Sequence, residues 1–157
     1  MKKNPDGTQQ LTLDLIRGIL VKELGINDDR VNIYNQKFKI PPDDQIFIEV
    51  GYKGSPKTIS SRNIVKDVAG NFTEYQEIAM MEHIYVGMFS SGLDAIRRKE
   101  EMLMAINSVY AQQIQEANSF KIARLSAIDD LSALEGAAML YRFEISLVVF
   151  ACSFRKA

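Results

Sequence analysis

The sequence predicts a single α+β domain in which a mostly antiparallel sheet of long strands packs against two helices. Three observations lead there. The chain has 157 residues, 46% of them apolar, which suits one compact core. Two long runs, residues 72–89 and 138–154, are rich in β-formers. Residues 10–24 and 93–117 instead repeat their apolar side chains at helical spacing. The expected order is α-β-β-β-α-β-β, a layered arrangement of helices on a sheet.

The first helix is expected over residues 10–24, after a flexible N-terminal tail over 1–9. Gly25 is a natural stop for this helix. Gly18 lies inside it, where glycine costs about 1 kcal/mol relative to alanine, so we expect a neighbour to pack closely there. The apolar positions form two adjacent stripes, which are Leu11, Leu15 and Ile19, and Ile16, Leu20 and Leu24.

Two strands are expected next, over 31–34 and 46–52. Ile40-Pro41-Pro42 separates them and must be a loop, because proline cannot donate to a sheet ladder. In the second strand the apolar residues alternate with the others and form one face, made of Ile46, Ile48, Val50 and Tyr52.

Residues 53–66 are predicted to form a hairpin arm that projects from the sheet, with Ser, Thr, Gly and Pro residues at its tip, and Gly54-Ser55-Pro56 is expected to end the 46–52 strand. The segment holds Lys53, Lys57, Arg62 and Lys66 and no acid. These four residues are the candidate partner interface, since a basic arm fits an acidic neighbour such as another copy of the chain or a partner ring. A solvated loop is the alternative.

The run 72–89 is a strand with Ile84, Val86 and Met88 on one face and His83, Tyr85 and Phe89 on the other. A helix over 93–117 follows, with Ser91 as its expected cap. Its buried stripe would be Ile96, Leu103, Ile106, Tyr110 and Ile114. Lys121 to Leu125 is a short strand, and an Asp-Asp-Leu turn precedes the final strand.

The composition argues against several classes of protein. Nineteen Lys and Arg balance twenty Asp and Glu, so the net charge of −1 gives no general attraction to nucleic acid or membranes. No apolar run reaches the length of a membrane helix, and the N-terminus lacks the apolar stretch of a signal peptide. The one cysteine allows no internal disulfide, which is typical of a reducing cytoplasm.

No catalytic, metal or cofactor site is expected. His83 is the single histidine and lies mid-strand, so we interpret it as a structural strand residue. Cys152 alternates with apolar positions and is expected to be a small buried hydrophobe. The pairs Asp28-Asp29, Asp43-Asp44 and Asp129-Asp130 fall in predicted turns, where aspartate caps the backbone. The methionines 80, 81, 102 and 104 are expected to fill the core, or else to form an adaptable interface.

A weak motif near the C-terminus carries a family resemblance. Ile128, Asp130 and Leu131 precede a strand that contains Tyr141-Arg142-Phe143 and Ile145. This motif, the long 72–89 strand and the following helix together resemble the tail terminator and tail-completion (neck) proteins of long-tailed bacteriophages, over most of residues 10–155.

The resemblance implies a subunit that forms a homo-oligomeric ring, usually a hexamer. Such a ring caps the tail tube protein, offers a surface to the head connector and lets DNA pass through its lumen. The expected location is the virion, with assembly in the host cytoplasm and no membrane or cofactor. A ring also suits the long strands, whose unpaired edges it would remove. Another neck ring protein, or a small cellular binding module, is the alternative.

Overall fold

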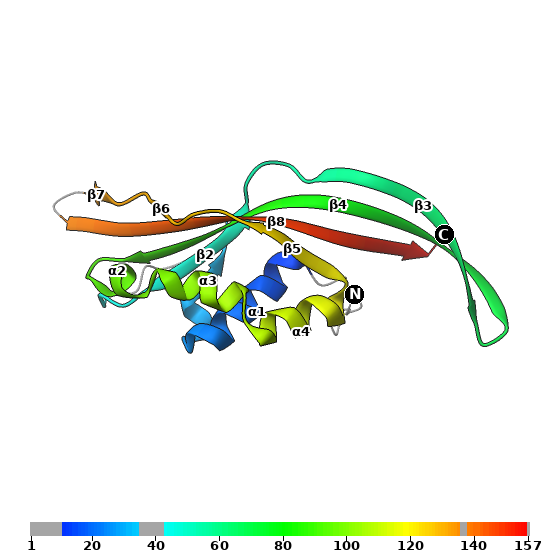
Figure 1. The fold of residues 1–157 in the computed structure, drawn as a ribbon, viewed down its shortest axis with the longest axis horizontal. Helices are drawn as coiled ribbons and strands as arrows, with labels where there is room; N and C mark the ends of the chain where they lie inside the picture. The colour runs from blue at the N-terminus through cyan, green and yellow to red at the C-terminus, as the bar shows by residue number, and fades with distance from the viewer. Residues whose placement is uncertain (1–10, 35–42, 136–137, 157) are drawn as a thin grey trace.

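The computed structural model describes residues 11–34, 43–135 and 138–156. It shows an elongated molecule built on one long, twisted sheet, with the helices gathered on one face of part of it (Figure 1). The α+β class and the mostly antiparallel sheet of long strands are confirmed. The predicted tail over 1–9 and the Ile40-Pro41-Pro42 loop lie outside the described residues.

Two very long strands are the axis of the sheet. β4 (Asn71–Ser90) and β8 (Ala138–Lys156) pair antiparallel from Tyr75 opposite Lys156 to Ser90 opposite Tyr141. The central path is β1-β2-β4-β8-β5, with β1 (Val31–Ile33), β2 (Phe47–Tyr52) and β5 (Phe120–Leu125). β3 (Lys57–Val68) pairs with β4, and β6 (Asp129–Asp130) and β7 (Ala133–Glu135) pair with β8. Only the short β1–β2 pair is parallel among these described strands.

The first helix, α1 (Thr12–Leu24), begins and ends nearly as predicted. Gly25 ends it in the left-handed conformation with φ of 64°. The stripe residues Ile16, Ile19 and Leu20 are completely buried. Two details of the prediction are wrong. Leu11 is 54% exposed, and a Cβ on Gly18 would meet nothing within 4 Å.

The second predicted helix is broken into α2 (Asp94–Arg98), α3 (Glu100–Ile106) and α4 (Val109–Asn118). Lys99 keeps helical dihedrals, so α2 runs on into α3. Asn107 leaves the helical region and Ser108 is extended, which ends α3 and starts α4. The short 3₁₀ helix η1 (Asp28–Arg30) leads into β1.

The core lies between the helices and the inner face of the sheet. Ile84, Val86 and Met88 of β4 are completely buried, as predicted. Phe143 on β8 lies opposite Met88 and is 5% exposed, which confirms the register inferred for the last strand. The predicted stripe over 96–114 is only partly right: Ile106 is buried, but the deepest positions include Ala95, Met102, Ala105 and Ala111.

Candidate interaction surface

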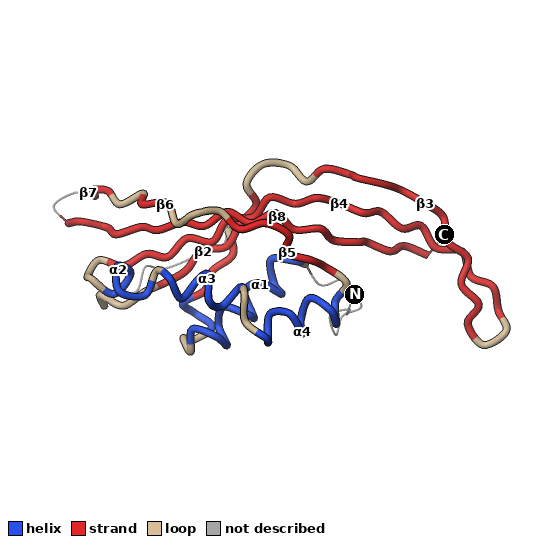
Figure 2. The backbone as a smooth tube through the Cα atoms, in the orientation of Figure 1, coloured by secondary structure: helices blue, strands red, loops and turns tan. Residues whose placement is uncertain are grey.

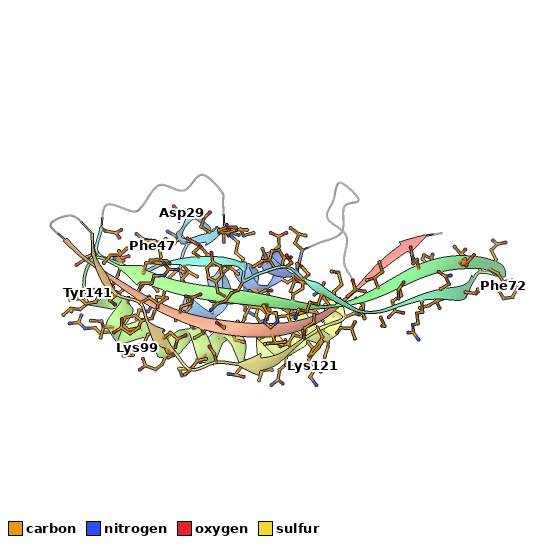
Figure 3. All side chains as sticks on the ribbon, turned by 90° about the horizontal axis from the view of Figure 1, so that it is seen from above. Asp29, Phe47, Phe72, Lys99, Lys121 and Tyr141 are labelled. Carbon is orange, nitrogen blue, oxygen red and sulfur yellow. The ribbon has the colours of Figure 1, made fainter. Side chains whose placement is uncertain are left out.

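A projecting arm is the most prominent feature of the molecule. The β3–β4 hairpin and the end of β8 continue well beyond the helices as a curved ribbon (Figures 1 and 2). β3 pairs with β4 from Lys57 opposite Met81 to Val68 opposite Asn71. Figure 3 shows Phe72 at the far tip and Tyr141 toward the opposite end. An arm was expected, but over 53–66. The structure extends it to residues 57–81 and we call this hairpin the arm.

The tip of the arm is the turn at Ala69-Gly70, which lies beyond the predicted segment 53–66. Ala69 and Gly70 have φ of 55° and 80°. Positive φ at both central residues is the geometry of a type I′ turn, which closes two-residue hairpins because it matches the twist of the strands. Gly54-Ser55-Pro56 follows the end of β2, as predicted, and connects β2 to β3 at the base of the arm.

The structure separates the four predicted interface residues. Lys53 is not on the arm: it follows β2, its amide donates to the His83 carbonyl at 2.8 Å, and its ammonium donates to the Ser146 hydroxyl at 3.2 Å. Lys57, Arg62 and Lys66 are all on β3, opposite Met81, Glu77 and Thr73 respectively. Three of the four residues therefore share one strand.

The arm also carries acids that the sequence analysis did not connect with its bases. The Arg62 guanidinium forms an ion pair with Glu77 at 2.9 Å, in which Arg62 is 69% exposed and Glu77 only 12%. Burial, followed by a hydrogen bond to Glu77, raises the pKa of the Cys152 thiol. Cys152 is thus a half-buried thiol kept in its neutral form, close to the interpretation as a small hydrophobe.

Most of the described side chains of β3 are exposed. Ile59 and Val65 are 55% and 62% exposed, and Phe72 across the turn is 79% exposed. A β-bulge lies between Thr58 and Ser60. Among the described strands β3 pairs only with β4, so its outer edge is an open row of backbone donors and acceptors.

A second open edge lies at the other end of the sheet, in the segment 126–135. We call this segment the acidic edge, because it holds Asp129, Asp130 and Glu135 and no base. β6 and β7 within it pair only with β8 among the described strands. The Ser132 hydroxyl and amide hold the pKa of Asp130 below its usual value, and Leu131 is 45% exposed. Asp129-Asp130 was predicted as a turn and is instead a short strand.

The sheet face opposite the helices carries an aromatic cluster that the sequence analysis missed. The rings of Phe47 and Phe89 stack with centroids 5.1 Å apart, and the Arg142 guanidinium lies 4.9 Å from the Phe89 centroid. The Tyr85 hydroxyl donates to Glu49, and burial together with this carboxylate raises the pKa of Tyr85. The cluster stabilises the sheet by stacking and charge-assisted bonds.

The residues weighed for catalysis do not converge. His83 is a half-buried strand residue whose carbonyl accepts from Lys53. Asp43 pairs with Arg30 and accepts from the Gln45 amide, which are structural roles. In the described ranges no group of three His, Cys, Asp or Glu side chains is placed to hold a metal ion. A polar depression of about 410 Å³ lies beside Asp44, Leu93 and Arg97.

The chain matches no model of a known protein family, and no curated protein resembles it in sequence. Among the described helices, none has both the length and the apolar character needed to cross a membrane.

Proposed function

We propose that this chain is a structural virion protein of a tailed bacteriophage, a tail terminator that forms a ring on the tail tube at the head–tail junction. The observation that carries the proposal is the arm. No fully buried apolar residue lies between positions 57 and 81 among those described. Beyond the pairing of Tyr75 with Lys156 the arm is a two-stranded hairpin, and such a hairpin is marginally stable unless another surface packs against it.

The architecture supports a subunit rather than an isolated domain. Strands of 19 and 20 residues far exceed the usual 5 to 6. Open edges of this kind are a liability in a monomer, and closure into a ring removes them. The long strand, the helical segment after it and the last strand follow one another as the resemblance implies, and β3, β6 and β7 are strands added to the expected order α-β-β-β-α-β-β.

The test has two stages. The mass of the purified protein should be measured by light scattering after size exclusion over a range of concentrations, and a mass near six copies is expected. The protein is then added to polymerising tail tube protein of the same phage, where it should stop elongation and appear as a cap in electron micrographs. A tube that elongates normally in the presence of assembled rings contradicts the terminator role.

Two alternatives give different results in the same experiments. Another neck protein would form rings that bind the head connector and leave tube elongation unchanged. A cellular binding module would remain a monomer or dimer and bind a small ligand in a concave apolar pocket. The depression beside Asp44 is lined largely by polar and charged residues, so it gives this reading no support.

A further inference from the structure

The two open edges of the sheet are complementary in charge. β3 holds three bases, Lys57, Arg62 and Lys66, and one acid, Asp67. The acidic edge holds three acids and no base. Each edge also exposes aliphatic side chains, with Ile59 and Val65 on β3 and Leu131 on the acidic edge.

These edges cannot meet within one chain. β3 lies outside β4 on one side of the sheet, whereas β6 lies outside β8 on the other side. Across the sheet, Arg62 lies opposite Glu77, and Glu77 lies opposite position 154 of β8. Asp129 lies opposite Glu144 of the same strand. The ten residues between these two positions of β8 correspond to about 33 Å at the rise of a β-strand. The complementarity is therefore available only to a second molecule.

We propose that β3 of one copy of this chain pairs edge to edge with the acidic edge of a second copy. Each copy then uses one edge for each neighbour, so the contact is head to tail and repeats until a ring closes. The sheet becomes continuous from subunit to subunit. This inference rests on the proposed function for ring closure and names the contact between its subunits.

The same features that favour this pairing disfavour others. Lysines on an edge strand discourage pairing with an uncharged or like-charged edge. A copy of β3 against itself would bring like charges opposite one another, which is destabilising. An acidic strand reverses this effect, because opposite charges lie across the new ladder.

Charge reversal tests the contact. Lys57→Glu/Lys66→Glu changes the arm and leaves the Arg62–Glu77 pair in place. Asp129→Lys/Glu135→Lys changes the acidic edge and leaves the Asp130 carboxylate on the Ser132 amide. Each double variant should weaken self-association about tenfold at moderate salt, as expected for two charge pairs. The chain with all four changes should recover to within about threefold of the original protein.

A matched control reverses two bases on the helix layer, in the variant Lys22→Glu/Arg97→Glu. It carries the same change in net charge and should self-associate normally. Equal weakening by the control, or additive weakening in the fourfold variant, overturns the proposal.

Chemical cross-linking tests the position of the contact. In a Cys152→Ser background, Ile59→Cys or Val65→Cys protein is mixed with Leu131→Cys protein and treated with a short bis-maleimide. Cross-linked dimers should form in the mixture and be scarce in either protein alone. Val109→Cys on α4, 70% exposed, replaces the arm cysteine as the control and should give none.

The outcomes separate this inference from the proposed function. Rings that form without these cross-links, Ile59→Cys or Val65→Cys protein that links to itself, or a strict monomer each overturn the edge pairing. Correctly cross-linked rings that leave tube elongation unchanged refute the terminator role and retain the contact.

Discussion

Because Gly51 has no side chain, the side chains of Tyr34 and Tyr85 can meet beside it. It lies on β2 opposite Tyr85, and a Cβ placed on it would be 2.6 Å from the Cβ of Tyr34 and 2.7 Å from the Tyr85 ring. The two tyrosine rings meet edge to face with centroids 6.4 Å apart. Any larger residue at position 51 must displace this pair.

We expect Gly51→Ala to lower the free energy of unfolding by about 1–3 kcal/mol, the usual cost of overpacking. Gly18→Ala is the matched control. Its Cβ meets nothing within 4 Å, so this variant should gain up to about 1 kcal/mol from helix propensity. Urea denaturation of the two variants measures both values. A Gly51→Ala protein as stable as the original would show that Tyr34 moves freely.

Glu82 is an acid placed on the buried side of β4. It is 8% exposed, its Oε1 accepts from the Thr12 hydroxyl at 3.4 Å, and its Oε2 has no partner among the described residues. Burial raises the pKa of Glu82, and the nearby Tyr52 and Thr12 hydroxyls oppose this shift. Burial and the Glu82 charge in turn raise the pKa of Tyr52 to about 12.

The raised pKa of Glu82 makes stability depend on pH. The folded state holds this proton more tightly than the unfolded state, so the associated stability is present below the unfolded pKa and is lost as the pH rises through the folded pKa. Glu82→Gln cannot ionise. We expect it to be more stable than the original protein by about 1 kcal/mol at pH 7.5, and the difference should shrink toward pH 4.5. Urea denaturation across this range tests it, and a constant difference contradicts the assignment.

Two serine hydroxyls, those of Ser90 and Ser108, accept hydrogen bonds from backbone amides in the helical segment between β4 and β5. The Ser108 hydroxyl accepts from the Ala111 amide at 3.0 Å and caps α4. The expected cap Ser91 plays no such part: the Ala95 amide donates to the Ser90 hydroxyl at 2.9 Å, which in turn donates to the Gly92 carbonyl. The predicted cap was thus one residue away from the side chain that satisfies this turn.

We expect Ser108→Ala to cost about 1 kcal/mol, as for other lost N-caps, and Ser91→Ala to stay within about 0.5 kcal/mol of the original protein. Thermal or urea unfolding of the two variants compares them directly. Equal losses would mean that Ser91 stabilises the start of α2 through a contact other than a cap.

Sequence patterns predicted the elements that bury one face and failed for those that bury none. β2, the inner half of β4 and β8 place aliphatic residues at alternate positions against the core, so their periodicity was readable. β3 is exposed on most of its length and mixes Lys, Ser, Arg and Ile without alternation. Its turn at Ala69-Gly70 lacks the asparagine or aspartate that usually marks such turns, so the arm was placed too early.

The sequence predicted one part of the candidate interaction surface, the basic arm, and not the acidic edge. A basic arm was inferred from residues 53–66, and three of its four bases do lie on β3. The acidic edge was not identified, because three acids in a turn-like segment are ordinary in sequence. Only the pairing of β6 and β7 with β8 shows that these acids line an open edge at the far end from the arm.

In the molecule as a whole, the buried core lies in one part of the sheet and the arm, which we propose for assembly, lies in another. The buried apolar cluster draws on α1, β1, β2, the inner half of β4, the helices α2–α4, β5 and β8, and includes no residue from 57 to 81. Stability should therefore reside in the part covered by helices, and the arm should contribute little to it.

Shortening the arm tests this division. Ser61 lies directly opposite Ile78, so replacing residues 62–77 with Asn-Gly closes the hairpin with a favoured two-residue turn. The shortened chain should lose less than about 1 kcal/mol in urea denaturation, because surface segments away from the core contribute little, and should remain monomeric in light scattering. A large loss of stability would place part of the core in the arm, and normal assembly would show that the subunits meet through another surface.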